Sequence, residues 1–223
     1  VSDTDIEISG EPIASGKTKE LFAAGNGLVL VCSKDDLTAG DGRKHIKLPG
    51  KGAAANEITC NTFALLNACG NPLLRTAFVR RYEDASFISK QCTMVLLEVV
   101  VRRSAHGSYL KRNPSMLRGK RFDRLVFELY LKTSGKVWNG QSIPCDDPLM
   151  IIQDGKAQLY LPTEPVADQQ PFLVLDEFPL SDRPDLLEQI EEAALRAFLV
   201  FEKAWQLQGG QLCDYKIEFG FTS

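Results

Sequence analysis

The sequence lacks the features that mark membrane-bound, secreted and nucleic-acid-binding proteins. Apolar runs such as Val95–Leu97 and Val99–Val101 are separated by Glu98 and are far shorter than the ~20 residues of a membrane-spanning helix. No targeting segment and no block of lysine or arginine residues is recognisable, and the formal net charge is −3. We therefore expect neither a membrane nor a nucleic acid among the partners of this protein.

Cysteine and histidine are scarce and lack the spacing of metal or catalytic sites. The six cysteines form no C-x-x-C pair, so we interpret them as free thiols and predict a cytoplasmic location. Neither His45 nor His106 belongs to a Ser-His-Asp or Cys-His pattern, which argues against a nucleophilic hydrolase. The composition itself is globular, with 44% hydrophobic and 25% charged residues, and fits one large domain or two lobes.

The order of the predicted elements favours an α+β fold with largely antiparallel sheets. Strands are predicted at 13–22, 28–32, 75–80, 85–89, 92–103, 125–132 and 212–219, with a hairpin at 149–161. Helices are predicted at 53–69 and from an N-cap at Asp182 to Gly209-Gly210. Residues 34–52 and 162–184 are expected to be irregular. A lobe boundary near Leu96 divides the chain into 1–96 and 97–223.

A glycine followed by two lysines, Gly16-Lys17-Thr18-Lys19, has the composition of a phosphate-binding segment. A P-loop is disfavoured, because the preceding glycine is out of register and the chain continues into a hairpin rather than a helix. Lys17 and Lys19 would instead project from one face of a strand, where both could meet a polyphosphate. The alternative is an edge strand whose charges discourage pairing with other strands.

Charged residues on two predicted strands indicate further candidates. Alternation places Asp214, Lys216 and Glu218 on one face of the last strand, which suits either a divalent cation with an anionic substrate or a surface ion pair. Glu98 and Arg102 share a face of an otherwise apolar strand, and a buried glutamate needs a partner. A structural ion pair and a functional role remain the two interpretations of this pattern.

Two loops carry charges as well. Positive charge and a hydroxyl gather around Gly107 in a segment that would suit a phosphate ester: Arg103, Ser108, Lys111 and Arg112. Acidic residues follow a predicted strand at Lys34-Asp35-Asp36, where a capped turn is an equally good explanation.

Taken in order, these motifs resemble the family of phosphoribosylaminoimidazole-succinocarboxamide synthases, the SAICAR synthetases of purine biosynthesis. The resemblance covers most of the chain and rests on segments 16–19 (GKTK), 34–42 (KDDLTAGDG), 50–52 (GKG) with Asn56, 97–102 (LEVVVR), 107–112 (GSYLKR), 146–148 (DDP) and 214–220 (DYKIEFG). Each segment alone is weak evidence, whereas seven in the same order are specific.

The resemblance implies a two-lobed α+β fold with an ATP cleft between the lobes, the first lobe binding ATP phosphates and the second binding substrate and metal. It implies an ATP-dependent amide ligase: ATP phosphorylates the carboxylate of carboxyaminoimidazole ribotide, and the amine of L-aspartate displaces the phosphate. Mg²⁺ would accompany ATP. Assembly into a homo-oligomer is left open.

The resemblance also implies roles for individual residues. The ATP phosphates would lie at Gly16, Lys17 and Lys19, and adenine would face the backbone near Met94 and Leu96. Glu218 would bind the metal, and Lys216 and Asp36 are the candidate catalytic residues. The ribotide would be bound by Arg102, Ser108, Lys111, Arg112 and Lys216. Lys51, Asn56 and Asp147 match family positions without an assigned role.

Departures from the family pattern keep alternatives open, and one is the segment 149–184, which is longer and richer in proline than expected for the family. Asp146 stands where the family usually has histidine. The family usually continues past the last strand into a segment with further acidic ligands and an arginine, so we expect the 223 residues to lack that segment. A related ligase with a different acid or amine and a nucleotide-binding pseudoenzyme are therefore retained. A kinase is disfavoured, because the sequence has no His-Arg-Asp or Asp-Phe-Gly motif.

Overall fold

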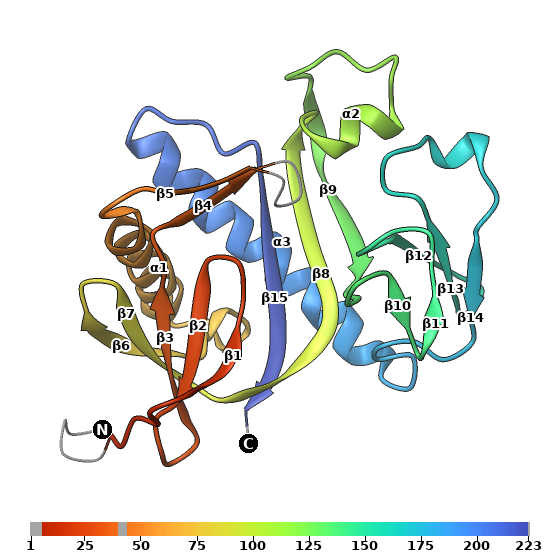
Figure 1. Ribbon diagram of the computed structural model, residues 1–223. Helices are drawn as coiled ribbons and strands as arrows, with labels where there is room; N and C mark the ends of the chain where they lie inside the picture. The colour runs from red at the N-terminus through yellow and green to blue at the C-terminus, as the bar shows by residue number, and fades with distance from the viewer. Residues whose placement is uncertain (1–5, 40–43, 223) are drawn as a thin grey trace. The chain divides into compact units, whose positions relative to one another are not determined.

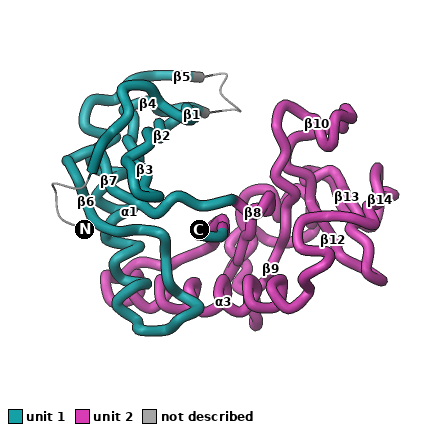
Figure 2. The backbone as a smooth tube through the Cα atoms, turned by 90° about the horizontal axis from the view of Figure 1, so that it is seen from below, with its two compact units in different colours: residues 1–93, 221–223 teal, residues 94–220 magenta. Residues whose placement is uncertain are grey.

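The computed structural model describes residues 6–39 and 44–222, and its two compact units are coloured separately in Figure 2. One unit comprises residues 1–93 with 221–223, and the other comprises residues 94–220. The sequence-based boundary lies near Leu96 and assigns every later residue to the second lobe, so the two divisions differ by a few residues at each end.

The first unit is built on a five-stranded antiparallel sheet in the order β1-β2-β3-β7-β6 (Figure 1). Its strands are β1 (Pro12–Ser15), β2 (Lys19–Ala23), β3 (Leu28–Ser33), β6 (Phe78–Glu83) and β7 (Ser86–Lys90). The predicted hairpin around Asn26-Gly27 is confirmed, because β2 pairs with β3 and both turn residues have positive φ angles of 49° and 69°.

The predicted continuous strand at 13–22 is wrong. The chain turns at Gly16–Thr18, and β1 folds back to pair with β2, so that Ser15 lies opposite Glu20. The Gly16 amide donates to the carbonyl of Lys19 at 2.8 Å, which closes the turn. Lys17 therefore lies in the turn and Lys19 at the start of β2, and the two do not share one strand face as predicted.

Burial on both faces explains why β3 is the centre of this sheet. Val29 and Val31 pack with Cys60 of α1 (Lys51–Ala68) on one face. Leu28 and Leu30 pack with a different apolar group on the opposite face. A strand that is buried on both sides needs a continuous apolar sequence, and 28–31 supplies it.

A second antiparallel pair, β4 (Asp36–Ala39) with β5 (Lys44–Lys47), occupies a segment that was predicted to be irregular. The predicted helix at 53–69 is confirmed as α1, which begins two residues earlier at Lys51. Its first turn lies close to the end of β3: a Cβ added at Gly52 would lie 2.6 Å from the Ser33 carbonyl oxygen and 3.1 Å from Oδ1 of Asp35. Only glycine fits this approach.

The second unit is built on a six-stranded sheet in the order β14-β13-β12-β9-β8-β15 (Figure 1). The strands are β8 (Cys92–Ser104), β9 (Arg121–Leu131), β12 (Leu149–Gln153), β13 (Lys156–Tyr160), β14 (Leu173–Leu175) and β15 (Asp214–Thr222). The long helix α3 (Pro184–Leu207) packs against it through Ile190, Ala194 and Phe198. Short elements complete the unit: α2 (Ser108–Arg112), β10 (Val137–Trp138), β11 (Gln141–Ser142) and a 3₁₀ turn at Val166–Asp168. A second 3₁₀ turn, Pro72–Leu74, belongs to the first unit.

Two details of the second unit differ from the sequence prediction. β14 lies inside the proline-rich segment 162–184, because three residues suffice to pair with the edge of β13. The N-cap of α3 is Arg183 rather than Asp182, and Pro184 occupies the first helical position, where its fixed φ angle suits the start of a helix.

Among residues 6–39 and 44–222, no helix is both long and apolar enough to cross a membrane.

Replacing Gly52 with alanine tests the close approach of α1 to β3. Helix propensity alone would make alanine more stable than glycine by about 1 kcal/mol. We expect the opposite sign, a loss of about 1–3 kcal/mol in the free energy of unfolding, because the new methyl group overlaps backbone atoms. Urea unfolding measures the effect. Gly10→Ala is the control, since a Cβ there meets nothing within 4 Å. A Gly52→Ala variant as stable as the parent would contradict the packing.

Candidate functional site

One face of the second sheet carries a row of charged side chains on three adjacent strands. β8, β9 and β15 turn alternate residues toward α3, where Val99, Leu129 and Ile217 join the core. The intervening residues face the other way: Glu98 and Arg102 on β8, Glu128 and Tyr130 on β9 with Lys132 directly after it, and Asp214, Lys216 and Glu218 on β15. The predicted alternation of β15 is thus confirmed, since Tyr215, Ile217 and Phe219 pack on the core. We call the opposite side of the sheet the polar face.

At one end of the polar face, a buried carboxylate holds Arg102 in place. Glu128 accepts a hydrogen bond from Nε of Arg102 at 2.6 Å and another from Arg112. Tyr130 donates to the same carboxylate at 3.2 Å. The remaining donors of Arg102 reach Asp214 at 3.0 Å and the Ser108 hydroxyl at 3.2 Å. Every edge of this guanidinium is therefore positioned by a partner.

At the other end, two lysines lie among three carboxylates. Lys216 donates to Glu98 and to Glu218, each at 2.8 Å. Lys132 contacts Glu98 directly and lies 3.6 Å from Asp147 and 3.9 Å from Glu218. Glu98 and Arg102 share the predicted strand face, but each has its partners on neighbouring strands. Residues four apart along a strand are separated by roughly 13 Å, which is too far for a direct ion pair.

These contacts set the ionisation of the groups. Burial raises the pKa of Glu98, but hydrogen bonds from Lys132 and Lys216 outweigh burial and bring the pKa below its ordinary value. Burial lowers the pKa of Lys216, and the carboxylates of Glu218 and Glu98 raise it by more. Glu98 is thus an anion and Lys216 a cation at neutral pH, so Lys216 can donate hydrogen bonds but is not a general base.

The structure brings together some, but not all, of the candidates in segment 103–112. Ser108 begins α2 and reaches Arg102, and Arg112 ends α2 with its guanidinium buried between Glu128 and the Pro162 carbonyl. Lys111 is exposed on α2. Arg103 points to the opposite side of β8 from Arg102, where it forms two hydrogen bonds with Glu202 of α3.

The candidates for nucleotide binding are divided between the β1–β2 turn of the first unit and β8 of the second. Gly16 and Lys17 form the β1–β2 turn, and the ammonium of Lys19 lies 6.0 Å from the centre of the Phe87 ring. Met94 and Leu96 are side-chain exposed on β8, next to the buried Val95 and Leu97. A strand with exposed alternate residues keeps its core contacts while presenting the other side chains to solvent.

The two neighbouring acidic residues, Asp35 and Asp36, have different roles. Oδ1 of Asp35 accepts the Gly52 amide at 2.8 Å, and Oδ2 accepts the Gly50 amide at 3.3 Å, so this carboxylate satisfies donors at the start of α1. Asp36 begins β4 and contacts the ring nitrogen Nε2 of His45 on β5. That hydrogen bond holds the pKa of Asp36 below its ordinary value. Gly40, Asp41 and Gly42 of the same motif lie outside the described residues.

The polar face offers a metal ion the carboxylate of Glu218 but no complete set of ligands among the described residues. In the part of the chain that the structure describes, no group of three or more His, Cys, Asp or Glu residues is arranged to hold a metal. Glu218 is partly exposed, and its contacts with both lysines are made through Oε1. Magnesium bound with nucleotide phosphates uses one or two protein carboxylates and several waters. Glu218 fits that limited requirement.

Sequence reasoning missed the contribution of β9 to the polar face. Glu128, Tyr130 and Lys132 lie on the alternating segment 125–132, so the same period of two that exposed the β15 ladder would have placed them on one face. What the sequence could not supply is the strand order, which places β9 and β15 on either side of β8.

Substituting Glu98 with glutamine tests the lysine–carboxylate network through its pH dependence. Because the folded pKa of Glu98 lies below the ordinary value of 4.5, its ionised form stabilises the fold above that pH, and the stabilisation is lost as pH falls through the folded pKa. We expect Glu98→Gln to cost about 1–3 kcal/mol at pH 7 and progressively less toward pH 3. Urea unfolding at several pH values measures this difference. The exposed Glu57→Gln serves as control, and a pH-independent cost for Glu98→Gln would refute the assignment.

Comparison with known proteins is consistent with this arrangement. Residues 12–141 match the family model described as SAICAR synthetase. The phosphoribosylaminoimidazole-succinocarboxamide synthase of Roseiflexus sp. (strain RS-1) is 37% identical over 213 residues, which span 95% of this chain and 72% of that protein. A crystal structure of the synthase from Ehrlichia chaffeensis is 24% identical and superposes with a TM-score of 0.74, covering 96% of this chain and 76% of that one. A SAICAR synthetase in complex with ADP is also 24% identical, with a TM-score of 0.67 over 96% of this chain and 75% of that one. The matched segments, the extent of the match and the level of identity establish that the chain belongs to the SAICAR synthetase family.

Proposed function

We propose that this protein is an ATP-dependent ligase of purine biosynthesis that joins L-aspartate to carboxyaminoimidazole ribotide through an acyl phosphate. The observation that carries the proposal is the fixed Arg102, whose guanidinium is held by Glu128, Asp214 and Ser108. Arg102, Ser108 and Glu128 lie within the residues 12–141 that match the family model. Membership of the family makes the chain a ligase, and relatives at 37% identity favour this substrate pair over a related ligase or a pseudoenzyme.

The reaction needs ATP because a carboxylate oxygen is a poor leaving group. Transfer of the γ-phosphoryl group to the ribotide carboxylate produces an acyl phosphate. The aspartate amine then attacks the carbonyl carbon, the carbon–oxygen bond to phosphate breaks, and an amide and inorganic phosphate are formed. The acyl phosphate must be protected from water until the amine attacks. The protein therefore has mainly to bind, orient and neutralise charge.

Arg102 and Ser108 are proposed to bind the ribotide. A guanidinium whose rotamer is already set by Glu128 loses little conformational freedom when it binds a phosphate or carboxylate. Arg112 is proposed to act through Glu128 rather than by direct contact, because its side chain is buried behind that carboxylate. This modifies the sequence-based hypothesis of a direct substrate contact. Exposed Lys111 keeps the proposed role of a ribotide contact.

The ATP phosphates are proposed to bind at Gly16, Lys17 and Lys19, and adenine at the backbone of Met94 and Leu96. The β1–β2 turn supports the first assignment, since Gly16 and Lys17 are exposed there and the lysine ammonium can reach a phosphate. In this proposal Lys216 stabilises negative charge as a donor. The proposed catalytic role of Asp36 is to position a reacting group, because its depressed pKa makes it a weak base.

Magnesium is proposed to enter with ATP and to be held by Glu218. When bound, the ion would neutralise charge on the phosphates. The proposed location is the cytoplasm, which agrees with six cysteines that are all free thiols.

The direct test mixes the purified protein with ATP, Mg²⁺, carboxyaminoimidazole ribotide and L-aspartate. We expect ADP, phosphate and the succinocarboxamide product to form in equal amounts. A coupled assay measures ADP, and chromatography measures the succinocarboxamide. Omission of aspartate is the control that separates ligation from simple ATP hydrolysis. Absence of ADP release in the complete mixture would contradict the proposal.

The metal role of Glu218 can be separated from a structural one. We expect Glu218→Gln to lower kcat about tenfold or more and to raise the Mg²⁺ concentration needed for half-maximal rate. The free energy of unfolding should change by less than about 1 kcal/mol, because the pair with Lys216 is partly exposed. The exposed Glu177→Gln is the matched control. Equal losses of turnover and stability would instead identify Glu218 as a structural residue.

A further inference from the structure

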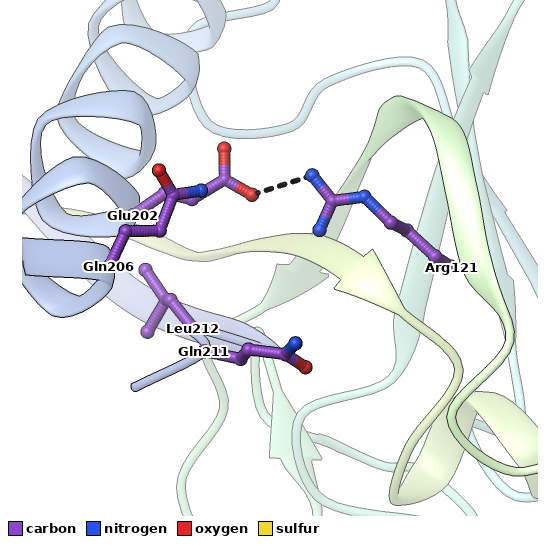
Figure 3. Close-up of a pocket in the computed structure, with 5 residues that line it drawn as sticks. All are labelled: Arg121, Glu202, Gln206, Gln211 and Leu212. Carbon is purple, nitrogen blue, oxygen red and sulfur yellow. Dashed lines mark hydrogen bonds and ion pairs between the residues drawn. The ribbon is translucent and has the colours of Figure 1, made fainter. Parts of the chain in front are cut away.

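A small cavity in the second unit lies on the α3 side of the sheet, opposite the polar face. Its volume is about 170 Å³, and it is lined by Arg121, Glu202, Gln206, Gln211 and Leu212. Figure 3 shows the five residues: Glu202 and Gln206 on α3, Arg121 from the start of β9 with its guanidinium directed at Glu202, and Gln211 and Leu212 in the segment that leads into β15. None of them belongs to the ATP, ribotide or metal positions proposed above.

The charge balance inside the cavity leaves one cation in excess. Glu202 is buried, and Arg103 already satisfies both of its oxygens with hydrogen bonds of 2.7 and 2.9 Å. This fork holds the pKa of Glu202 below its ordinary value. Arg121 adds a second positive charge through one longer contact of 3.2 Å to Oε1. A buried carboxylate needs one cation to compensate it, so Arg121 is not required for that purpose.

Arg121 is free to use its other donors. Its side chain is 61% exposed, whereas that of Glu202 is 10% exposed. A guanidinium has five N–H donors in a planar fork that matches the oxygens of a phosphate or carboxylate. Gln206 and Gln211 line the same cavity, and each carries a neutral amide with two N–H donors. Leu212 supplies an apolar wall.

The surrounding chain strengthens the positive potential. Segment 118–124 (RGKRFDR) contains four basic residues and one acidic residue, in a chain whose overall formal net charge is −3. Among the described residues that line the cavity, Glu202 carries the single carboxylate, and its oxygens are engaged. The electrostatic potential at the cavity therefore favours an anion, and the lining residues offer a cation no unpaired carboxylate.

We propose that this cavity is a binding site for a small oxyanion, either inorganic phosphate or a short-chain carboxylate, held by Arg121 with the amides of Gln206 and Gln211. The size agrees, since a cavity of about 150 Å³ accommodates a molecule of six heavy atoms. The site is separate from the proposed ribotide site, because Arg121 meets Glu202 of α3 on the side of the sheet opposite Arg102.

The cavity lies next to the residues that precede β15, so a bound anion could influence the start of that strand. Gln211 and Leu212 directly precede Cys213, whose carbonyl accepts the amides of Arg103 at 2.8 Å and Ser104 at 3.2 Å. Asp214, the partner of Arg102, is the next residue. An anion that orders Gln211 and Leu212 thus acts on the residues that begin the strand carrying Lys216 and Glu218.

The test titrates the ¹⁵N-labelled full chain with sodium phosphate and, separately, with sodium succinate, while sodium chloride holds the ionic strength constant. Side-chain amide signals of Gln206 and Gln211 report on the cavity, so binding near Arg102 is not mistaken for it. We expect saturable shifts of these signals. Shifts with phosphate alone assign phosphate, and shifts with succinate alone assign a carboxylate.

Variants then identify the anion-binding group. Arg121→Gln should weaken the affinity tenfold or more, since a charge-assisted hydrogen bond is lost. Arg121→Lys should give an intermediate affinity, because it keeps the charge without the planar fork. The control Arg124→Gln removes the same charge from an exposed residue outside the cavity and should change the affinity less than about twofold. Glu202 stays paired with Arg103 in all three variants, so folding is retained, which circular dichroism verifies.

Two results would overturn the proposal. One is that the amide signals of Gln206 and Gln211 move no further with phosphate or succinate than with chloride. The other is that Arg121→Gln binds the anion as tightly as the parent chain.

Discussion

The pleat of three adjacent strands, β9, β8 and β15, determines which side chains of the second unit enter the core and which form the polar face. Because successive side chains alternate between the two faces of a sheet, each strand gives every second residue to the core beneath α3 and the rest to the polar face. Arg102, Glu128 and Asp214 are far apart in the sequence and come within hydrogen-bond distance through this alternation. A shift of one residue in any strand would turn its charged side chains into the core.

Charge compensation on the polar face follows from that placement. Glu128 is buried and is neutralised by two arginines, and Glu98 is neutralised by two lysines. Removing one member of such a network leaves an uncompensated charge in a region of low dielectric constant, so the groups fix one another's geometry. Rigid donors that are already oriented suit phosphoryl and acyl chemistry, in which the protein supplies position and charge rather than covalent steps. The same sheet separates this face from the Arg103–Glu202 pair, so consecutive arginines serve different sites.

Several predictions from sequence are confirmed because a local pattern carried enough information. The apolar run at 28–31 specified a central strand, Asn26-Gly27 specified a turn, and the alternation of 214–219 specified which residues face the core. The sequence-based predictions were wrong where the local pattern was short or was compatible with both a turn and a strand. Gly16–Thr18 closes a turn instead of continuing a strand, and three-residue β14 is stabilised by pairing with β13 rather than by its own propensity. The partners of Glu98 cannot be found from the sequence, because Lys132 and Lys216 reach it only through the strand order that places β9 and β15 beside β8.

The sequence by itself determined the family, the α+β class and the faces of the main strands, because ordered motifs and a period of two are properties of the chain alone. The tertiary structure decided which charges meet. Glu98 is paired with Lys132 and Lys216 rather than left unpaired, Asp35 satisfies the start of α1, and Arg121 gains a cavity beside Glu202. Each of these contacts joins segments that are far apart in the sequence, and their positions in the sequence do not tell how far apart they lie in space. Strand order and helix packing create them, and both depend on how the whole chain buries its apolar surface.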